Sequence, residues 1–229
     1  MKRVRAVGRT ARSFPPRAEV LILPRPRPRA SAAMSVARAL GLRRTTREVG
    51  SRPLSLQMTS DLLWAAAGVN RTRGPFGLSG RTAASASNSQ EIDVYVAMQQ
   101  GTYLYDPVRH ALEPVAAEDL RRMAIGHGQS SLGDHAPLRL IYVADIDRLV
   151  HTQGFREPGL RDPAVQRSYY YVDTGLMAAN VYLFAAAAGL AAWFHNCDRR
   201  GLAAGLKLRP GQRALFGQTV GHPGPASRR

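Results

Sequence analysis

The pattern of apolar and polar positions predicts a series of strands and helices. Apolar residues stand at every second position of 92–98, which is typical of a half-buried strand, and 102–105 pairs back on it after a turn. Ser55 is a good N-cap for a helix over 56–69, where apolar residues recur at helical spacing. We expect another short helix within 35–48, before a cluster of arginines.

The second half of the chain contains the clearest helix signal. Asp162 followed by Pro163 is a natural helix start, and the helix is predicted to run to about residue 188. Its part from 176 onward is apolar on nearly all sides, so we expect it to be buried. The other predicted elements are a strand near Leu112, a helix over 116–124, strands over 138–143, 191–195 and 214–220, and a helix capped by Asp198 that ends near 206. This irregular interleaving predicts a layered α+β domain and not a doubly wound sheet.

Composition narrows the class of protein. The chain has 229 residues, of which 45% are hydrophobic and 21% are charged, and this excludes a wholly unfolded protein. Cys197 is the only cysteine, so an intramolecular disulfide and a cysteine-based zinc site are both excluded. None of the six histidines has another four positions away, and we expect no metal site.

Positive charge is concentrated at the N-terminus. Residues 1–34 contain nine arginines and lysines and one acid, Glu19, so they carry half of the net charge of +16. Their prolines and like charges predict a disordered basic arm, or an extension upstream of a true start at Met34, with the folded domain over 35–229. The arm could alternatively bind nucleic-acid phosphates or an anionic membrane.

No segment has the pattern of a targeting signal. The first thirty residues lack the apolar stretch of a secretory signal. Residues 175–194 are uncharged but rich in alanine, which is close to neutral for membrane insertion, so a buried helix running into a strand explains them better. We therefore expect a cytoplasmic protein without a membrane span.

The common catalytic signatures, a phosphate-binding loop and a nucleophile elbow, do not occur. Residues 126–131 begin like a dinucleotide-binding turn but have serine in place of the third glycine. Two segments remain as candidates. Residues 43–47 gather three arginines and two threonines that can bind phosphate, or else form a solvated charged surface. Residues 85–90 carry small and amide side chains that would let a flat ring approach the backbone, or else form an ordinary loop.

Four segments occur in the order of the motifs of one known family. Arg43-Arg44-Thr45-Thr46-Arg47 resembles the Arg-Arg-Ser-x-Arg start of the nitroreductase family, whose members are flavoproteins that use FMN. Residues 85–90 are similar to its Pro-Ser-x-x-Asn-x-Gln segment, and 133–137 to its Ala-Pro segment before a strand. Residues 173–190 resemble its long central helix, which ends in a Gly-Leu-Gly turn.

The resemblance covers about residues 36–223. Within the family, residues 60–70 look most like the branch of SagB-type dehydrogenases. Membership would imply a three-layer αβα fold with a central mixed, mainly antiparallel sheet. It would also imply a homodimer, with one FMN held at each end of the dimer interface.

The resemblance also implies roles for individual residues. Arg43, Arg44 and Thr45 would hold the FMN phosphate and ribityl chain. Arg47 would face the N1 edge of the flavin, where a fixed cation stabilises the negative charge of the reduced ring. Six further positions would contact the ring system: Ser85, Ala86 and Asn88 from the partner subunit, Gln129 at the pyrimidine edge, and His195 and Asn196 in the turn whose backbone N–H faces N5.

The expected function is an FMN-dependent oxidoreductase. It would transfer hydride between NAD(P)H and a small electron-poor acceptor such as a nitroaromatic, quinone or enone, or dehydrogenate a SagB-type substrate. The flavin carries this chemistry, so no catalytic side chain is expected. The alternative is a basic nucleic-acid-binding protein that has this fold but no flavin; otherwise we expect only weak nucleic-acid contact through residues 1–34.

Overall fold

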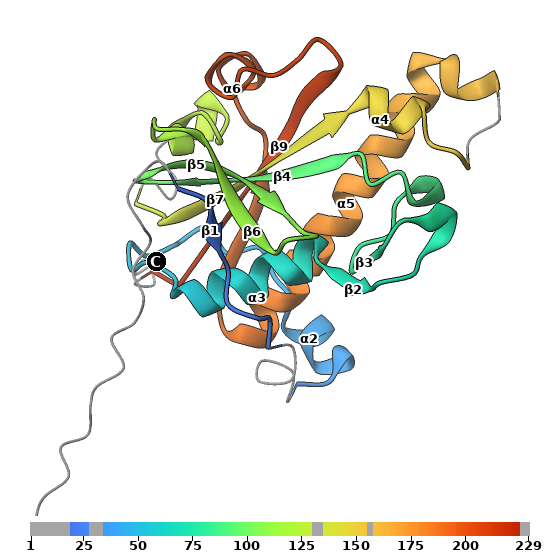
Figure 1. Cartoon of the computed structure of the whole chain (residues 1–229). Helices are drawn as coiled ribbons and strands as arrows, with labels where there is room; N and C mark the ends of the chain where they lie inside the picture. The colour runs from blue at the N-terminus through green and yellow to red at the C-terminus, as the bar shows by residue number, and fades with distance from the viewer. Residues whose placement is uncertain (1–18, 28–33, 130–134, 155–157, 225–229) are drawn as a thin grey trace, which may run out of the picture.

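A computed structural model of the chain describes residues 19–27, 34–129, 135–154 and 158–224. Within them, seven strands form one sheet in the order β1-β6-β5-β4-β7-β9-β8, with every neighbouring pair antiparallel (Figure 1). The strands are β1 (Leu21–Ile22), β4 (Ile92–Met98), β5 (Gly101–Asp106), β6 (Ala111–Ala116), β7 (Leu138–Asp145), β8 (Ala191–His195) and β9 (Gln212–Gly221). A separate ribbon pairs β2 (Val69–Arg71) with β3 (Gly80–Arg81).

Helices cover both faces of the large sheet. The long α5 (Pro163–Ala188) and α3 (Leu56–Ala67) pack on one face, and α6 (Arg199–Gly205) packs on the other (Figure 1). Two shorter helices, α2 (Val36–Leu42) and α4 (Ile146–Val150), contact α5. This arrangement confirms the layered α+β fold. The expected mixed component of the sheet does not occur among the described strands, all of which pair antiparallel.

The alternation along β4 divides its side chains between two cores. Val94 and Val96 contribute to the large core under α3 and α5, whereas Tyr95 and Ala97 contribute to the smaller core under α6. Every residue of β7 is buried because both faces of this central strand are covered. A strand covered on both faces is apolar almost throughout, which explains the run at 138–143.

The predicted long helix is confirmed as α5, but the burial expected from residue 176 onward is only partly found. Met177, Ala178, Val181 and Ala185 are buried, whereas Leu176 is 41% exposed, because only one face of α5 packs on the sheet. The Asp162 side chain accepts a hydrogen bond from the Ala164 N–H at 2.8 Å, and Pro163 occupies the first helical position. The helix ends at Gly189, whose φ of +67° is a left-handed conformation that glycine adopts without strain. The helix predicted at 56–69 is confirmed over 56–67, whereas Val69 begins β2; the strands at 92–98 and 191–195 are also confirmed.

The helix predicted over 116–124 is wrong. Ala116 instead ends β6, where it pairs with Thr102, and only a single 3₁₀ turn, η3 (Leu120–Arg122), follows. Asp119 caps this turn by accepting from the Arg121 N–H. Strand pairing with β5 therefore overrides the local helix propensity of the alanines.

The predicted disorder of residues 1–34 is wrong for residues 19–27, while 1–18 and 28–33 lie outside the described residues. Leu21 pairs with Leu112, so that β1 extends the sheet beyond β6. Leu23 is only 4% exposed and belongs to the large core. The prolines fit here because an edge strand has one row of backbone N–H groups that needs no partner.

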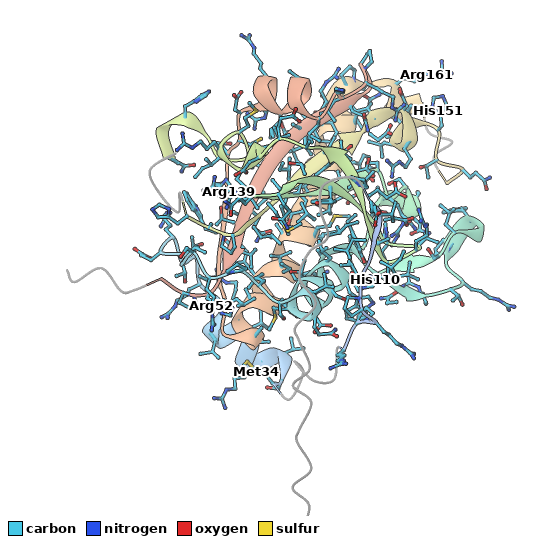
Figure 2. All side chains as sticks on the ribbon, turned by 60° about the vertical axis from the view of Figure 1, so that its left-hand side comes forward. Met34, Arg52, His110, Arg139, His151 and Arg161 are labelled. Carbon is cyan, nitrogen blue, oxygen red and sulfur yellow. The ribbon has the colours of Figure 1, made fainter. Side chains whose placement is uncertain are left out.

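Polar contacts of His110, which is labelled in Figure 2, also fix this N-terminal segment. The carbonyl of His110 accepts from the Leu23 N–H at 3.0 Å. Its Nε2 lies 2.7 Å from Ser60 Oγ, which donates to the carbonyl of Pro24, and its Nδ1 lies 2.8 Å from Tyr105 Oη. Burial lowers the pKa of His110, so the neutral ring can donate from Nε2 and accept at Nδ1.

Candidate functional site

The arginine cluster at residues 43–47 lies beside β8 and α5. The chain leaves α2 at Arg43, and the Thr46 N–H donates to the carbonyl of Ala192 in β8 at 2.9 Å. The Arg43 guanidinium lies 5.7 Å from the centre of the Tyr182 ring, and that of Arg47 lies 5.6 Å from Trp193. The backbone contact and the aromatic rings therefore position this segment.

Tyr182 of α5 joins this segment to β8. Its hydroxyl accepts from the Phe194 N–H at 2.8 Å and lies 3.1 Å from Thr45 Oγ1. Because the hydroxyl accepts from the backbone, its own proton is available for Thr45. One side chain thus holds the predicted hydroxyl ligand at the edge of the sheet.

The three guanidiniums of the cluster are available to an anion. Arg43, Arg44 and Arg47 are exposed. Within the described part of the chain, none of the three forms an ion pair with an acid. Three cations within five residues, without a carboxylate to neutralise them, favour a ligand that carries negative charge.

The end of β8 brings three predicted positions together. The carbonyl of Asn196 accepts from the Gly126 N–H at 2.8 Å, which connects this turn to η4 (His127–Gln129). Gln129 is the last residue of η4, and its Oε1 is buried without a hydrogen-bond donor among the described residues. An acceptor in this state leaves room for a donor from a ligand, because buried polar atoms are normally satisfied.

The His195 side chain points into the protein. It is 4% exposed, with Nε2 at 2.8 Å from Thr219 Oγ1 and Nδ1 at 2.9 Å from the carbonyl of Asn196. Burial lowers the pKa of His195 to about 4, so the ring is neutral at physiological pH. Both ring nitrogens are engaged, and His195 can therefore offer a ligand only its backbone.

The segment 85–90 has a constrained backbone. Ser87, Asn88 and Gln90 have φ angles of +48°, +55° and +51°, a left-handed region that such residues seldom occupy. The Asn88 amide is used within the loop, because it donates to the carbonyls of Pro75 and Ser79. Backbone strain of this kind costs free energy and is concentrated at functional sites.

A buried aspartate anchors this segment to α5. The Ala86 N–H donates to Asp173 Oδ2 at 2.8 Å, and the Ser85 hydroxyl accepts from the Gln90 N–H at 3.0 Å. Asp173 and Tyr182 are nine residues apart on α5, which corresponds to about 13 Å along the helix axis. Within one chain, the Ser85–Asn88 segment and the arginine cluster therefore contact different stretches of α5.

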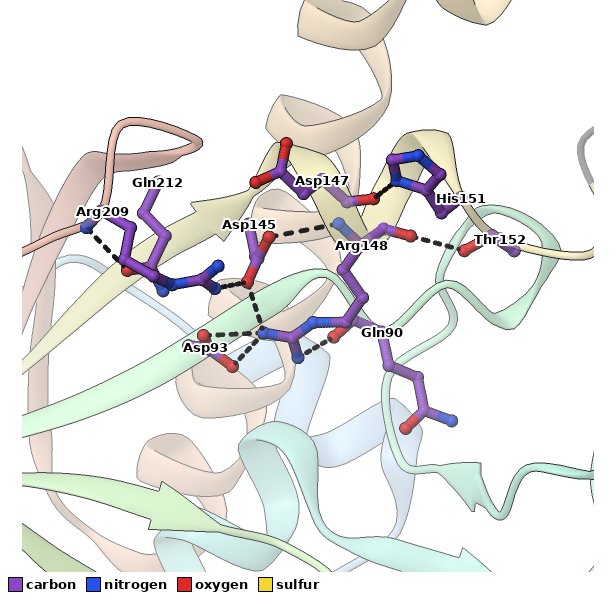
Figure 3. A network of polar contacts seen from close by, with 9 residues as sticks. All are labelled: Gln90, Asp93, Asp145, Asp147, Arg148, His151, Thr152, Arg209 and Gln212. Atoms are coloured by element: carbon purple, nitrogen blue, oxygen red, sulfur yellow. Dashed lines mark hydrogen bonds and ion pairs between the residues drawn. The ribbon is translucent and has the colours of Figure 1, made fainter.

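An ion-pair network contacts Gln90, the last residue of the 85–90 segment (Figure 3). Arg148 donates to the Gln90 carbonyl at 2.9 Å and to Asp93 at 2.8 Å. Burial raises the pKa of Asp93, and the charge of Arg148 opposes this effect. Arg209 binds Asp145, which also contacts Arg148 at 3.4 Å.

A cavity of about 50 Å³ lies beside this network and is lined by residues such as Arg81, Gln90 and Asp93. None of the predicted FMN-binding residues lines it. Within the described residues, no helix is long and apolar enough to cross a membrane, and no group of three potential metal ligands occurs.

The residues that support the predicted site had no assigned role in the sequence. Tyr182 and Trp193 lie in apolar segments and look like ordinary core residues, so no local signal separates them. Glu91 and Asp173 are buried acids, and Glu91 directly precedes an apolar strand. An acid directly before an apolar strand was the one feature of the sequence that could have indicated a buried carboxylate here. The predicted motif residues Gly133 and Asp134 lie outside the described residues.

Comparisons with known proteins agree on one family. The sequence profile of the nitroreductase family matches residues 40–222. A candidate nitroreductase of Methanocaldococcus jannaschii is 32% identical over 155 residues, which are 65% of this chain and 71% of that protein.

Solved structures give the same result. A candidate nitroreductase of Ralstonia eutropha has a TM-score of 0.75 at 37% identity, over 93% of this chain and 96% of the other. The E. coli microcin synthetase McbBCD complex contains a chain with a TM-score of 0.66 at 16% identity, over 97% of this chain and 79% of that one. At that identity, the second likeness concerns the fold alone.

Proposed function

The chain belongs to the nitroreductase family of oxidoreductases, and we propose that it binds FMN and transfers hydride between NAD(P)H and an electron-poor small molecule. Nitroaromatics, quinones and enones are the acceptor class that this chemistry suits. When bound, FMN supplies the hydride-accepting and hydride-donating centre, and the protein supplies binding and electrostatics.

The observation that carries the proposal is the unpaired arginine cluster beside β8. Arg43 and Arg44 supply the guanidinium charge that binds phosphate, and Thr45, held by Tyr182, offers a hydroxyl to the ribityl chain. The buried and unsatisfied Oε1 of Gln129 fits the one hydrogen-bond donor of the flavin pyrimidine ring. The residues present therefore fit FMN.

Arg47 has a different proposed role from its neighbours. Its guanidinium stacks near Trp193 in β8, two residues before His195. A cation held there would stabilise the negative charge that the flavin gains on reduction. The turn at His195 and Asn196 would contribute a backbone N–H, since the His195 side chain is fully engaged.

We further propose a homodimer in which each flavin is enclosed by two subunits. The Ser85–Asn88 segment and the arginine cluster contact α5 at different stretches, so a partner subunit is needed to bring them to one ligand. Val172 and Leu176 of α5 are 59% and 41% exposed and share one helix face. An exposed apolar stripe of this kind favours a self-complementary interface.

The absorption spectrum of the purified protein tests the cofactor. We expect yellow protein with flavin bands that bleach under anaerobic NADPH or NADH and return when an acceptor is added. Protein that is colourless and gains no flavin from added FMN would refute the enzyme function and leave the nucleic-acid alternative. Failure to bleach with either nucleotide, although FMN is bound, would favour dehydrogenation of a SagB-type substrate as the cellular direction.

Arginine variants test the assignment of the site. Arg43→Ala or Arg44→Ala should weaken FMN binding about ten- to a hundredfold, because a charge-assisted phosphate contact contributes about 1.5–3 kcal/mol. Arg47→Ala should slow flavin reduction more than it weakens binding. Arg200→Ala, an exposed arginine on α6, serves as the matched control. If all three cluster variants bound FMN with wild-type affinity, the cluster would be only a charged surface and not the FMN site.

A further inference from the structure

Two buried acids, Glu91 and Asp173, accept hydrogen bonds from the Ser85–Ser89 segment. Glu91, just before β4, is fully buried, and its Oε2 accepts from Ser89 Oγ at 2.5 Å. Its other oxygen, Oε1, is buried and has no hydrogen-bond donor among the described residues. A carboxylate oxygen that is buried without a donor is costly, which raises the question of what satisfies it.

The second acid is the one that holds Ala86. Asp173 is 3% exposed, and its carboxyl lies within hydrogen-bonding reach of Glu91 while accepting from the Ala86 N–H. Two carboxylates cannot hydrogen-bond each other, because both are acceptors. A hydrogen bond between these two groups therefore requires one proton on the pair.

The surrounding charges do not remove this requirement. In the part of the chain that is described, no arginine or lysine forms an ion pair with Glu91 or Asp173. The nearby cations Arg81 and Arg148 contact Gln90, and Arg148 is paired with Asp93. Burial raises the pKa of Glu91 to about 7 and also raises the pKa of Asp173.

We propose that Glu91 and Asp173 share one proton, which Glu91 donates from Oε1 to Asp173, and that this protonated pair positions the Ser85–Ser89 segment against the flavin. The positioning part rests on the proposed FMN function; the shared proton does not. Glu91 is a positioning residue, since it acts through Ser89 and through Asp173 on Ala86.

Loss of the proton has a defined structural effect. Two adjacent buried carboxylates repel each other and draw in water, because neither has a compensating cation. Asp173 then moves away from the Ala86 N–H, and the hydrogen bond between them is lost. Without this bond, Ser87 and Asn88 are no longer held in their strained left-handed conformation. The segment should therefore be ordered below the Glu91 pKa and loosened above it.

The first experiment needs no flavin. Infrared spectra of the full chain at about pH 6 and about pH 9, on either side of the Glu91 pKa of about 7, should show a protonated-carboxyl C=O band that disappears at the higher pH. Glu91→Gln should lack this band. Protection of the Ala86 amide against hydrogen exchange should fall about tenfold in the wild type over this range but stay constant in Glu91→Gln, whose amide mimics the protonated acid.

The second experiment measures FMN affinity over the same pH range. The FMN affinity of the wild type should fall about tenfold as the pH rises. The affinities of Glu91→Gln and Asp173→Asn, each of which supplies a permanent hydrogen-bond donor, should be nearly independent of pH. Glu118→Gln, an exposed acid, is the control and should follow the wild type.

The outcomes separate the two proposals. A wild type without the carboxyl band at about pH 6, or with Ala86 protection independent of pH, overturns the shared proton even if FMN binds. FMN binding with the same pH profile in wild type and Glu91→Gln overturns the positioning role. The expected infrared and exchange results in a protein that never binds FMN would instead refute the proposed function and leave the shared proton standing.

Discussion

Truncating Leu23 is the most direct test of whether the N-terminal segment is part of the folded domain. Leu23 is 4% exposed and packs into the large core, and its N–H pairs with the carbonyl of His110. Core Leu→Ala changes cost about 2–5 kcal/mol, and an edge position can relax, so we expect Leu23→Ala to lower the free energy of unfolding by about 2–3 kcal/mol. A disordered arm would instead give no change.

Urea unfolding of the full chain, followed by circular dichroism, measures this difference. The matched control is Ile22→Ala, the adjacent residue, whose side chain is 61% exposed and should cost less than about 0.5 kcal/mol. A chain that starts at Met34 should be destabilised as well, because it lacks β1 and leaves Ser60 without the Pro24 carbonyl. Equal midpoints and slopes for wild type, Leu23→Ala and Ile22→Ala would refute the docking of this segment.

Three further predictions concern polar groups that are buried or half-buried. Burial lowers the pKa of His195 from its ordinary value of 6.5 to about 4, so the neutral ring stabilises the fold fully above pH 6.5, and this stabilisation is lost as the pH falls through 4. The stabilisation amounts to about 3 kcal/mol, at about 1.4 kcal/mol per pH unit. His195→Gln should therefore flatten the pH dependence of the melting temperature over that range. Tyr182→Phe should lower the free energy of unfolding by about 1–2 kcal/mol, since it strips the acceptor from a backbone N–H, and a change below the error of urea titration would contradict this. Arg148→Met should destabilise by about 1–2 kcal/mol, because it leaves the half-buried Asp93 without its cation, and adding Asp93→Asn should recover part of the loss. A strictly additive double mutant would rule out the coupling.

Local signals explain why most of the fold was predictable from the sequence. Asp162 and Pro163 start α5 through a side-chain cap and a missing N–H, and both effects involve only neighbouring residues. The alternation in β4 similarly reports burial on its two faces. The helix predicted over 116–124 failed for the opposite reason, because pairing of Ala116 with Thr102 depends on a strand that local propensity does not register.

The candidate site divides in the same way. The arginines at 43–47 and the segment at 85–90 could be found from residue type and order, because phosphate and flat rings require particular side chains wherever the fold places them. That Tyr182 holds Thr45, and that His195 turns inward toward Thr219, could not be found in this way, since these contacts join residues from 24 to 137 positions apart.

The sequence by itself determined the layered α+β class, the long helix and the family, because caps, periodicity and short motifs act over a few residues. Only the tertiary structure decided that residues 19–27 complete the sheet and that Glu91 lies against Asp173. Both features depend on polar groups in a distant part of the chain. Residues 19–27 pair with the open edge of β6, and Glu91 lies against the buried carboxylate of Asp173 on α5. The need for these contacts arises only after the chain has packed, when water no longer solvates these groups.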